Sequence, residues 1–148
     1  MKWKHISRFE DLSPADVYNF LKLRQDIFII EQDCIYDDID TLDPECEHLM
    51  LYDGETLAAY SRLVPSGIKF DSPSIGRITV SNLYRGKGLG RKLVEKSIEI
   101  LRRDGQHQDI LIEAQVYLRK FYESFGFLKI SDPYDVDGID HIKMKLSF

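Results

Sequence analysis

The stretch from residue 74 to residue 115 limits the possible folds of this chain more than any other segment. Residues 74–80 and 109–115 have the composition of strands, and residues 88–103 between them have the spacing of an amphipathic helix. The inward face of this helix repeats every three to four residues, at Gly90, Leu93, Val94, Ser97, Ile98 and Leu101. Gly105 is the expected end of the helix. A strand, a helix and a strand in this order predict parallel strands joined by a right-handed crossover.

The rest of the chain predicts further strands and helices around this unit. Ser13 and Pro14 suit a helix N-cap and first turn, and an apolar stripe follows at helical spacing as far as Phe28. Strands are expected at residues 2–9, 48–52, 56–64, 127–131 and 141–146, a short helix at 118–125, and an acidic loop at 31–47. Residues 110–112 are expected to be buried on both faces of their strand. The element order is β-α-β-β-β-α-β-α-β-β, an α/β arrangement that fits one domain over residues 1–148.

The composition excludes several classes of protein. Hydrophobic residues make up 43% of the chain and charged residues 30%, which is typical of a globular domain. Apolar runs such as residues 27–30 are far shorter than the roughly 20 residues of a membrane span, so no membrane partner is expected. The net charge of −5 disfavours nucleic acid as a partner. No apolar signal segment follows the first residues, so a cytoplasmic location is expected.

The two cysteines give no sign of a metal site. Cys34 and Cys46 are expected to be free thiols, because a cytoplasmic chain keeps its cysteines reduced. Their spacing with His48 fits no zinc pattern, so no metal is predicted.

The charges are unevenly spread along the chain. Residues 31–47 carry only acidic charges, at Glu31, Asp33, Asp37, Asp38, Asp40, Asp43, Glu45 and Glu47. Residues 85–103 are mainly basic, at Arg85, Lys87, Arg91, Lys92, Lys96, Arg102 and Arg103. Two patches of opposite sign suggest two different ligands, and two solvated faces are an equally good explanation.

The loop before the helix has the features of an anion site. Gly86, Gly88 and Gly90 leave backbone N–H groups uncovered at a helix start, where the helix dipole also favours an anion. Basic residues surround the same turn, at Arg85, Lys87, Arg91 and Lys92. The strictly alternating glycines match neither the Walker loop nor the dinucleotide fingerprint, and a plain loop is the alternative explanation. The strand before and the basic helix after favour a phosphate site.

Two motifs resemble those of a known enzyme superfamily. Residues 75–90, IGRITVSNLYRGKGLG, resemble the acetyl-CoA motif of the GNAT N-acetyltransferases, and residues 121–127, FYESFGF, resemble their second signature. Residues 23–28, 31–32, 36–40, 114–115 and 137–142 are similar to the ElaA-like group of that superfamily. Glu113 departs from the small residue expected in that group. The resemblance implies the GNAT fold, with a single mixed central sheet flanked by helices, and one N-acetyltransferase domain over residues 1–148.

The resemblance also implies roles for individual residues. The backbone of Ile78 and Val80 is expected to pair with the pantetheine arm of acetyl-CoA, the co-substrate, and their side chains to belong to the strand's core. The cofactor's pyrophosphate is expected on the loop and helix start, at Arg85, Gly86, Lys87, Gly88, Leu89, Gly90 and Arg91. Tyr122 matches the tyrosine that protonates the departing thiolate in many members, and a packing aromatic is its alternative role.

The acceptor and the general base are less well defined by the sequence. Glu31, His48, Glu113 and His141, or a water held by one of them, are candidates for the base. The expected reaction is direct attack of an amine on acetyl-CoA in a ternary complex, by a monomer or homodimer. The acceptor is a small-molecule or peptide amine, and the acidic loop favours a cationic one. A non-catalytic acyl-CoA-binding or sensing module is the alternative, whereas an interaction domain would leave the glycine loop unexplained.

Overall fold

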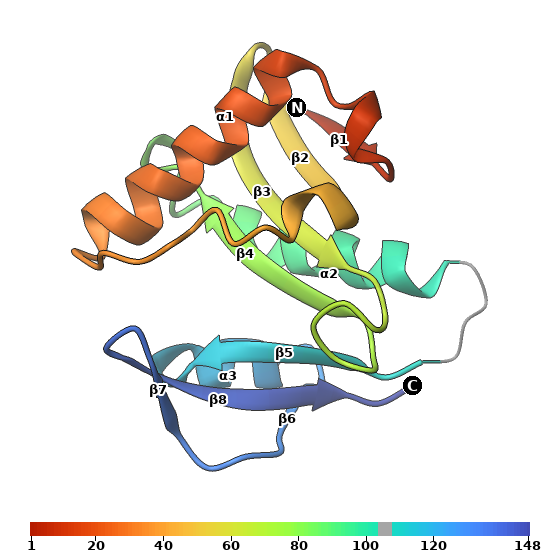
Figure 1. Cartoon of the computed structure of the whole chain (residues 1–148), viewed down its shortest axis with the longest axis vertical. Helices are drawn as coiled ribbons and strands as arrows, with labels where there is room; N and C mark the ends of the chain where they lie inside the picture. Colours follow the sequence, from red (N-terminus) through yellow and green to blue (C-terminus); the bar gives the residue numbers. More distant parts are fainter. Residues whose placement is uncertain (104–107) are drawn as a thin grey trace.

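A single mixed sheet organises the computed structural model of this chain, which describes residues 1–103 and 108–148 (Figure 1). The strands run in the order β1-β2-β3-β4-β5-β8-β6, and β7 pairs with β8. The strands are β1 (Lys2–Ile6), β2 (Glu47–Asp53), β3 (Thr56–Val64), β4 (Ser74–Val80), β5 (Ile110–Gln115), β6 (Leu128–Lys129), β7 (Tyr134–Val136) and β8 (Ile139–Leu146). The helices are α1 (Pro14–Arg24), α2 (Leu89–Arg102) and α3 (Arg119–Glu123). Only β4 and β5 pair in parallel within the described chain, as the strand–helix–strand pattern predicts.

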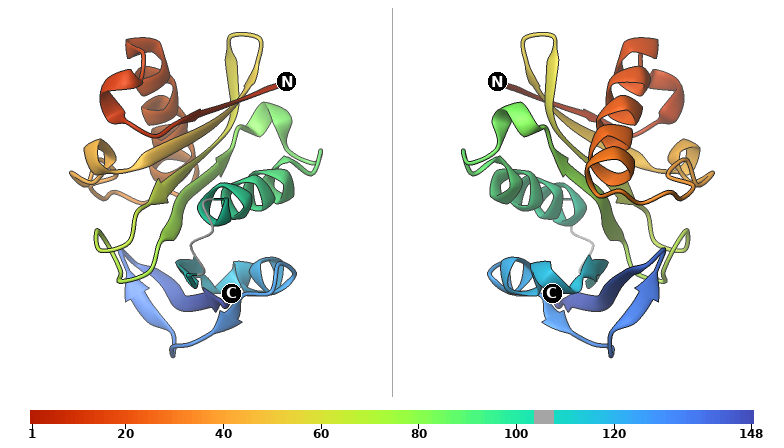
Figure 2. Two further views of the ribbon diagram at one scale, coloured as in Figure 1. Left: turned by 90° about the vertical axis from the view of Figure 1, so that its right-hand side faces the viewer. Right: turned by 90° about the vertical axis from the view of Figure 1, so that its left-hand side faces the viewer.

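Helices cover both faces of the sheet, and each face has its own core (Figure 2). On one face α1 packs Phe20 and Leu23 against Met50 and Tyr60 of β2 and β3. On the other face α2 and α3 enclose the larger core, which includes Leu49, Leu63, Leu93, Val94, Ile110, Ile112, Tyr122, Phe127 and Met144. None of the described helices is long and apolar enough to cross a membrane.

Helix α1 begins where the sequence predicts and continues further than expected. The side chain of Ser13 accepts a hydrogen bond from the backbone of Asp16, whose own side chain accepts one from Ser13, in a complete capping box. The helix then runs directly into a π-helix, Gln25–Glu31. Glu31 therefore lies at the end of a helix, and not in the acidic loop where it was expected.

The second half of the sheet differs in detail from the expectation. The strand expected at 127–131 is reduced to β6, and β7 was not predicted, because two or three residues carry no measurable alternation. Strands β7 and β8 form a hairpin whose turn has positive φ at Asp137 and Gly138. Helix α2 ends at Arg102, and Gly105, its expected stop, lies outside the described residues.

Strand β5 is buried on one face only. Ile110 and Ile112 are buried, whereas Leu111 between them is half-buried. The expectation of burial on both faces was wrong, because none of the described helices covers the second face of β5 and β8 (Figure 1).

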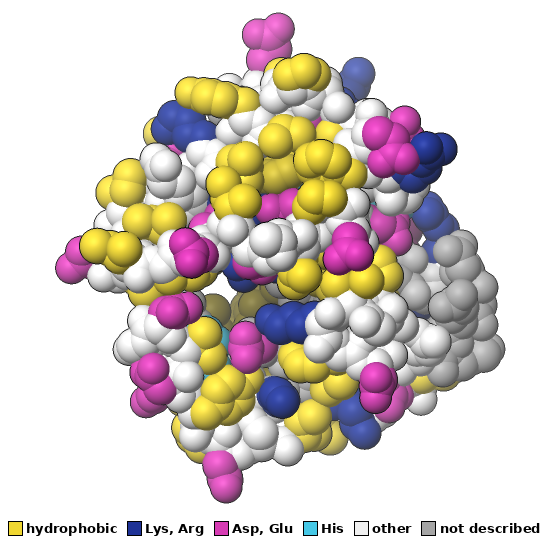
Figure 3. All heavy atoms as spheres, viewed as in Figure 1, with side chains coloured by type: hydrophobic (Ala, Val, Ile, Leu, Met, Phe, Trp, Pro, Cys, Tyr) yellow, Lys and Arg dark blue, Asp and Glu magenta, His cyan; other side chains and the backbone are white. Residues whose placement is uncertain are grey.

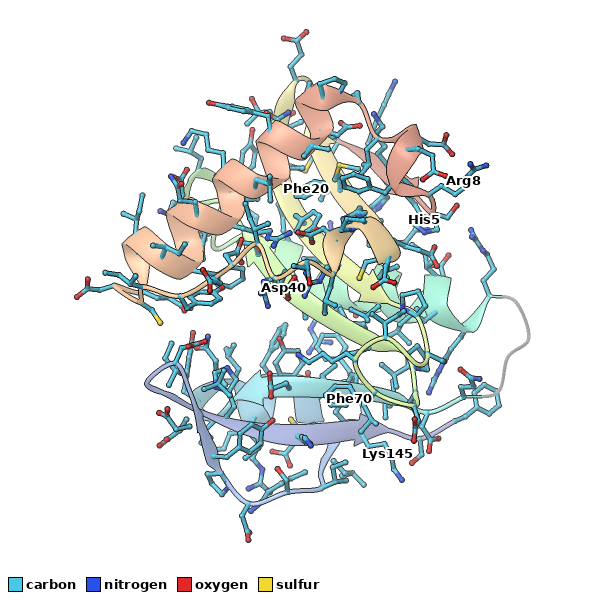
Figure 4. The ribbon with its side chains drawn as sticks, viewed as in Figure 1. His5, Arg8, Phe20, Asp40, Phe70 and Lys145 are labelled. Carbon is cyan, nitrogen blue, oxygen red and sulfur yellow. The ribbon has the colours of Figure 1, made fainter. Side chains whose placement is uncertain are left out.

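The acidic loop folds inward onto three arginines. Arg24 donates hydrogen bonds to Asp38 (2.9 Å) and Asp43 (2.8 Å), and Arg62 holds both carboxylate oxygens of Asp40 at 2.7 Å. Arg77, which lies on β4, donates hydrogen bonds to Asp38 and Asp40. Figure 4 shows Asp40 beneath α1, directed toward the strands. These carboxylates are neutralised inside the protein, so the expected acidic surface patch is much smaller than the sequence suggests.

Candidate active site

Strands β4 and β5 separate soon after they pair. Their register contains one pair, Ser74 with Leu111, next to a hydrogen bond from the Leu111 N–H to the Pro73 carbonyl at 3.0 Å. Beyond this point the strands diverge (Figure 1) and a cleft of about 620 Å³ opens. Its walls are β4, β5, the end of the α1 helical segment and the β7–β8 hairpin. Figure 3 shows the hollow between the two halves of the molecule, with acidic and basic side chains at its rim.

The cleft edge of β4 presents backbone groups that no described strand pairs with. The Ser81 N–H donates to the Ala58 carbonyl at 2.9 Å, and Val80 lies opposite Ala59 in the register. Because backbone groups alternate along an antiparallel pair, the N–H and C=O of Val80 and the C=O of Ile78 point away from β3 and toward the cleft. The side chains of Ile78 and Val80 meanwhile pack against the larger core. This edge can accept an extended ligand as a further strand.

The glycine loop forms the start of α2 at one end of this edge. Gly86 and Gly88 have φ of 78° and 74°, the left-handed region that glycine adopts without strain, and Gly88 is the N-cap of α2. Leu89 is buried in the core, and the first backbone N–H groups of α2 have no partner within the helix. Gly90 differs from the other two, because its φ is not positive and a Cβ there would lie 3.9 Å from Phe121 and Val80. Gly86 and Gly88 therefore allow the left-handed backbone of the loop, whereas Gly90 allows close packing of the helix against Phe121 and Val80.

The basic side chains around the loop have partners of their own. Arg85 makes a two-pronged ion pair with Glu31, whose second oxygen lies 2.6 Å from the Arg85 Nη2 atom. Lys87 lies over the ring of Tyr84, 5.4 Å from its centre. Arg91 lies 4.5 Å over the ring of Phe125 and donates a hydrogen bond to Ser124. These cations surround the start of α2. The Glu31 carboxylate binds the Arg85 guanidinium in the way that a phosphate group would.

Tyr122 lines the cleft from α3. Its side chain is buried and packs edge-to-face against Phe121 and Phe127, at centroid distances of 5.1 Å and 6.1 Å. Its hydroxyl has no hydrogen-bond partner among the described residues. Burial raises the pKa of Tyr122 well above its ordinary value, because the phenolate would be poorly solvated. The group is therefore a protonated donor at neutral pH.

The structure separates the four candidates for the general base. His48 is wrong as a candidate, because it is fully buried and stacked on Phe20, with both ring nitrogens used by the Tyr60 hydroxyl (2.8 Å) and the Asp43 carbonyl (2.9 Å). It does not line the cleft, whereas Glu31, Glu113 and His141 do.

Glu113 is held as a carboxylate. It accepts a hydrogen bond from the Tyr134 hydroxyl at 2.7 Å and one from Lys69 at 3.2 Å. Burial acts to raise the pKa of Glu113, but these partners outweigh it and the pKa is lowered. The hydrogen bond and charge of Arg85 likewise lower the pKa of Glu31. Both groups are weaker bases than an ordinary carboxylate.

Contacts across the cleft join residues to which the sequence assigns no role in the site. The Cys34 thiol donates to the Asp137 carbonyl at 3.2 Å, and the Gln115 amide reaches Gln32 at 3.4 Å. They tie the segment after α1 to β5 and to the β7–β8 turn. The family resemblance marks their segments, but it could not show that they pair, because the partners lie more than eighty residues apart.

This chain matches the family model "Acetyltransferase (GNAT) domain" over residues 11–148. The UPF0039 protein sll0451 of Synechocystis sp. is 42% identical over 93% of this chain and 90% of that protein. Protein ElaA of Escherichia coli is 34% identical over 97% of this chain and 95% of ElaA.

Two crystal structures extend the agreement from sequence to fold. An acyl-CoA N-acyltransferase from Pseudomonas aeruginosa matches with a TM-score of 0.93 and 32% identity, over 99% of both chains. E. coli ElaA matches with a TM-score of 0.89 and 33% identity, over 97% of both. The predicted GNAT fold, with a mixed sheet flanked by helices, is confirmed. This chain is an acyltransferase and belongs to the GNAT acetyltransferase family, in its ElaA-like group.

Proposed function

We propose that this enzyme transfers an acetyl group from acetyl-CoA to an amine by direct attack in a ternary complex. One observation carries the proposal: the unpaired backbone edge of β4 leads along the cleft to the Gly88-capped start of α2. An extended arm that ends in a pyrophosphate matches such a path, because the edge offers strand-type hydrogen bonds and the helix start favours an anion. The cofactor is therefore acetyl-CoA, acting as co-substrate.

The pyrophosphate would lie on the loop at Arg85–Arg91. Gly86 and Gly88 leave the backbone approachable, and the N–H groups of Leu89, Gly90 and Arg91 supply donors. Lys87 adds positive charge. Arg85 would exchange the carboxylate of Glu31 for a phosphate oxygen, which is a similar two-pronged partner.

The thioester would lie between β4 and Tyr122. The Val80 N–H points into the cleft, where it would stabilise the negative oxygen of the tetrahedral intermediate. When the C–S bond breaks, the thiolate needs a proton, and the Tyr122 hydroxyl is a protonated donor with no partner among the described residues. The carbon skeleton of the acceptor would occupy the remaining cleft, beside β5 and the β7–β8 hairpin.

The acceptor is an amine, either a small molecule or part of a peptide. The acidic loop is the main reason to expect a cationic acceptor, and the pairing of Asp38, Asp40 and Asp43 with arginines removes three of its eight negative charges. Glu31 and Glu113, two of the three carboxylate residues that line the cleft, also have cationic partners, and Asp137 is the third. We therefore extend the acceptor class to amines with no charge beyond the reacting nitrogen.

The test is acetyl transfer to a panel of amines. Release of free CoA and a mass increase of one acetyl group on the amine are measured together, at pH 8. We expect turnover with at least one class of amine, and no acetylated protein intermediate in the mass spectrum. Binding of acetyl-CoA without transfer to any amine would instead identify a binding or sensing module.

A further inference from the structure

We infer that His141 is the general base that takes the proton from the attacking amine. This rests on the proposed acetyl transfer, and it assigns a residue to the step that the proposal leaves open. His141 lies on β8, opposite Gln115 of β5 and Tyr134 of β7, and it lines the cleft. It is half-buried, so it is both held in place and reachable by a substrate.

One hydrogen bond determines which nitrogen of His141 carries the hydrogen. Nδ1 lies 2.7 Å from the carbonyl oxygen of Ile139. A carbonyl oxygen can only accept, so Nδ1 must be the donor, and in the neutral ring the lone pair is on Nε2. Nε2 lies on the far side of the ring from this contact and has no partner within residues 1–103 and 108–148. A fixed tautomer with a free lone pair at a cleft is what a general base requires.

The other candidates lack this combination. His48 uses both nitrogens in the core, Glu113 is bound by Tyr134 and Lys69, and Glu31 is bound by Arg85. A group that already accepts strong hydrogen bonds loses them when it takes a proton. Among the four, His141 alone can accept a proton without breaking a contact of the described chain.

The proton balance of the reaction is complete with this assignment. The ammonium R–NH₃⁺ gives one proton to Nε2, and the resulting neutral amine attacks the thioester carbonyl. When the C–S bond breaks, the thiolate takes a proton from Tyr122, and Tyr122 recovers one from the amide nitrogen as it becomes neutral. The imidazolium of His141 then releases its proton to solvent. The products are the acetylated amine, CoA as the thiol, and one proton.

His141→Asn tests the inference. The asparagine amide can still donate to the Ile139 carbonyl, but it has no basic nitrogen. With an amine substrate at pH 7 we expect kcat/KM to fall by about 10²–10⁴, with the Kd for acetyl-CoA within twofold of wild type. The deficit should shrink as pH rises toward the pKa of the amine, because the free base then forms without help. Added imidazole should restore part of the activity.

Glu113→Gln is the matched control. Tyr134 pairs with His141 across the hairpin, and Glu113 is the carboxylate whose charge interacts with the histidine. The other titratable or charged groups that line the same cleft are Glu31, Cys34, Tyr36, Lys69, Arg77, Arg85, Tyr117, Tyr122 and Asp137. If His141 is the base, the pH profile of kcat/KM for Glu113→Gln keeps its acidic limb, whereas the profile for His141→Asn loses it.

The outcomes separate this inference from the proposed function. Wild-type transfer with an undiminished His141→Asn variant overturns the base assignment alone, and so does a deficit that is equal at every pH and insensitive to imidazole. A wild-type enzyme that acetylates no amine overturns both. If the His141→Asn variant does not fold, a measurement on the wild-type enzyme still tests the inference. The acidic limb of its kcat/KM must coincide with the titration of the His141 ring protons by NMR, and a mismatch overturns the inference.

Discussion

Tyr122→Phe is expected to lower turnover by about 10²–10⁴, which corresponds to roughly 3–5 kcal/mol of transition-state stabilisation. The substitution removes only the hydroxyl and keeps the ring that packs against Phe121 and Phe127. Because that hydroxyl has no partner in the described chain, its loss leaves no unsatisfied group behind. The thermal midpoint should therefore stay close to that of wild type, and acetyl-CoA affinity should change little. Steady-state kinetics and calorimetry measure the two effects separately.

Tyr117→Phe is the matched control for this prediction. Tyr117 is 73% exposed and also reaches the cleft, so this variant removes a second hydroxyl from the same region. We expect its turnover to stay within about threefold of wild type, as for a group outside the proton-transfer path. Equal turnover of Tyr122→Phe and wild type from pH 6 to pH 9 would contradict the acid role. Matched losses of affinity and thermal stability in Tyr122→Phe would show that the hydroxyl is structural.

Asp43→Asn is expected to lower the free energy of unfolding by about 3–5 kcal/mol. One oxygen of the Asp43 carboxylate accepts hydrogen bonds from Arg24 at 2.8 Å and from Arg62 at 2.9 Å, and all three side chains are buried. A neutral amide would leave two buried guanidinium groups short of negative charge, which costs far more than the pair itself contributes. Denaturant unfolding measures the change. Glu45 is an exposed residue in the same turn, so Glu45→Gln is the control, and its free energy of unfolding should stay within about 0.5 kcal/mol of wild type.

The effect of Asp43→Asn should depend on pH. Burial acts to raise the pKa of Asp43, but hydrogen bonds from Arg24 and Arg62 outweigh it and lower the pKa. The same balance brings the pKa of the neighbouring Asp40 to about 2. A carboxylate with a lowered pKa contributes stability above its unfolded pKa of about 3.9, and loses it as pH falls through the folded value. The difference between Asp43→Asn and wild type should be constant from pH 5 to pH 7 and narrow below about pH 4. A difference that does not change in acid would contradict the ion-pair account.

Features set by neighbouring residues could be predicted from the sequence. The β4–α2–β5 unit follows from its own periodicity, and the start of α1 follows from Ser13 and Pro14. Strand β7 could not be predicted, because three residues contain too little pattern and are held by pairing with β8. The continuation of α1 into a π-helix as far as Glu31 could not be predicted either, because the helix dipole disfavours an acidic residue at the C-terminal end of a helix.

The chemistry of the site depended more on contacts between distant residues. The glycine loop and Tyr122 could be identified from local motifs. Their roles in one active site were predicted from the resemblance to a known family. The fate of the acidic residues could not be foreseen, because Arg62 and Arg77 meet them from strands far along the chain. The sequence likewise could not rank the candidate bases. That ranking depends on which side of the sheet holds His48, and on what already binds Glu31 and Glu113.

The central claim is that acetyl-CoA binds along the open edge of β4 and ends on the start of α2. Backbone amide NMR of the isotopically labelled protein, titrated with acetyl-CoA, tests it most directly. We expect the largest shifts at Val80 and at Gly88, Leu89 and Gly90, with slowed hydrogen exchange at the Val80 N–H. Adenosine, which lacks the pyrophosphate and the pantetheine arm, should leave the Val80 amide unchanged. Saturating acetyl-CoA that leaves all four amides unchanged, while shifting amides elsewhere, would contradict the account.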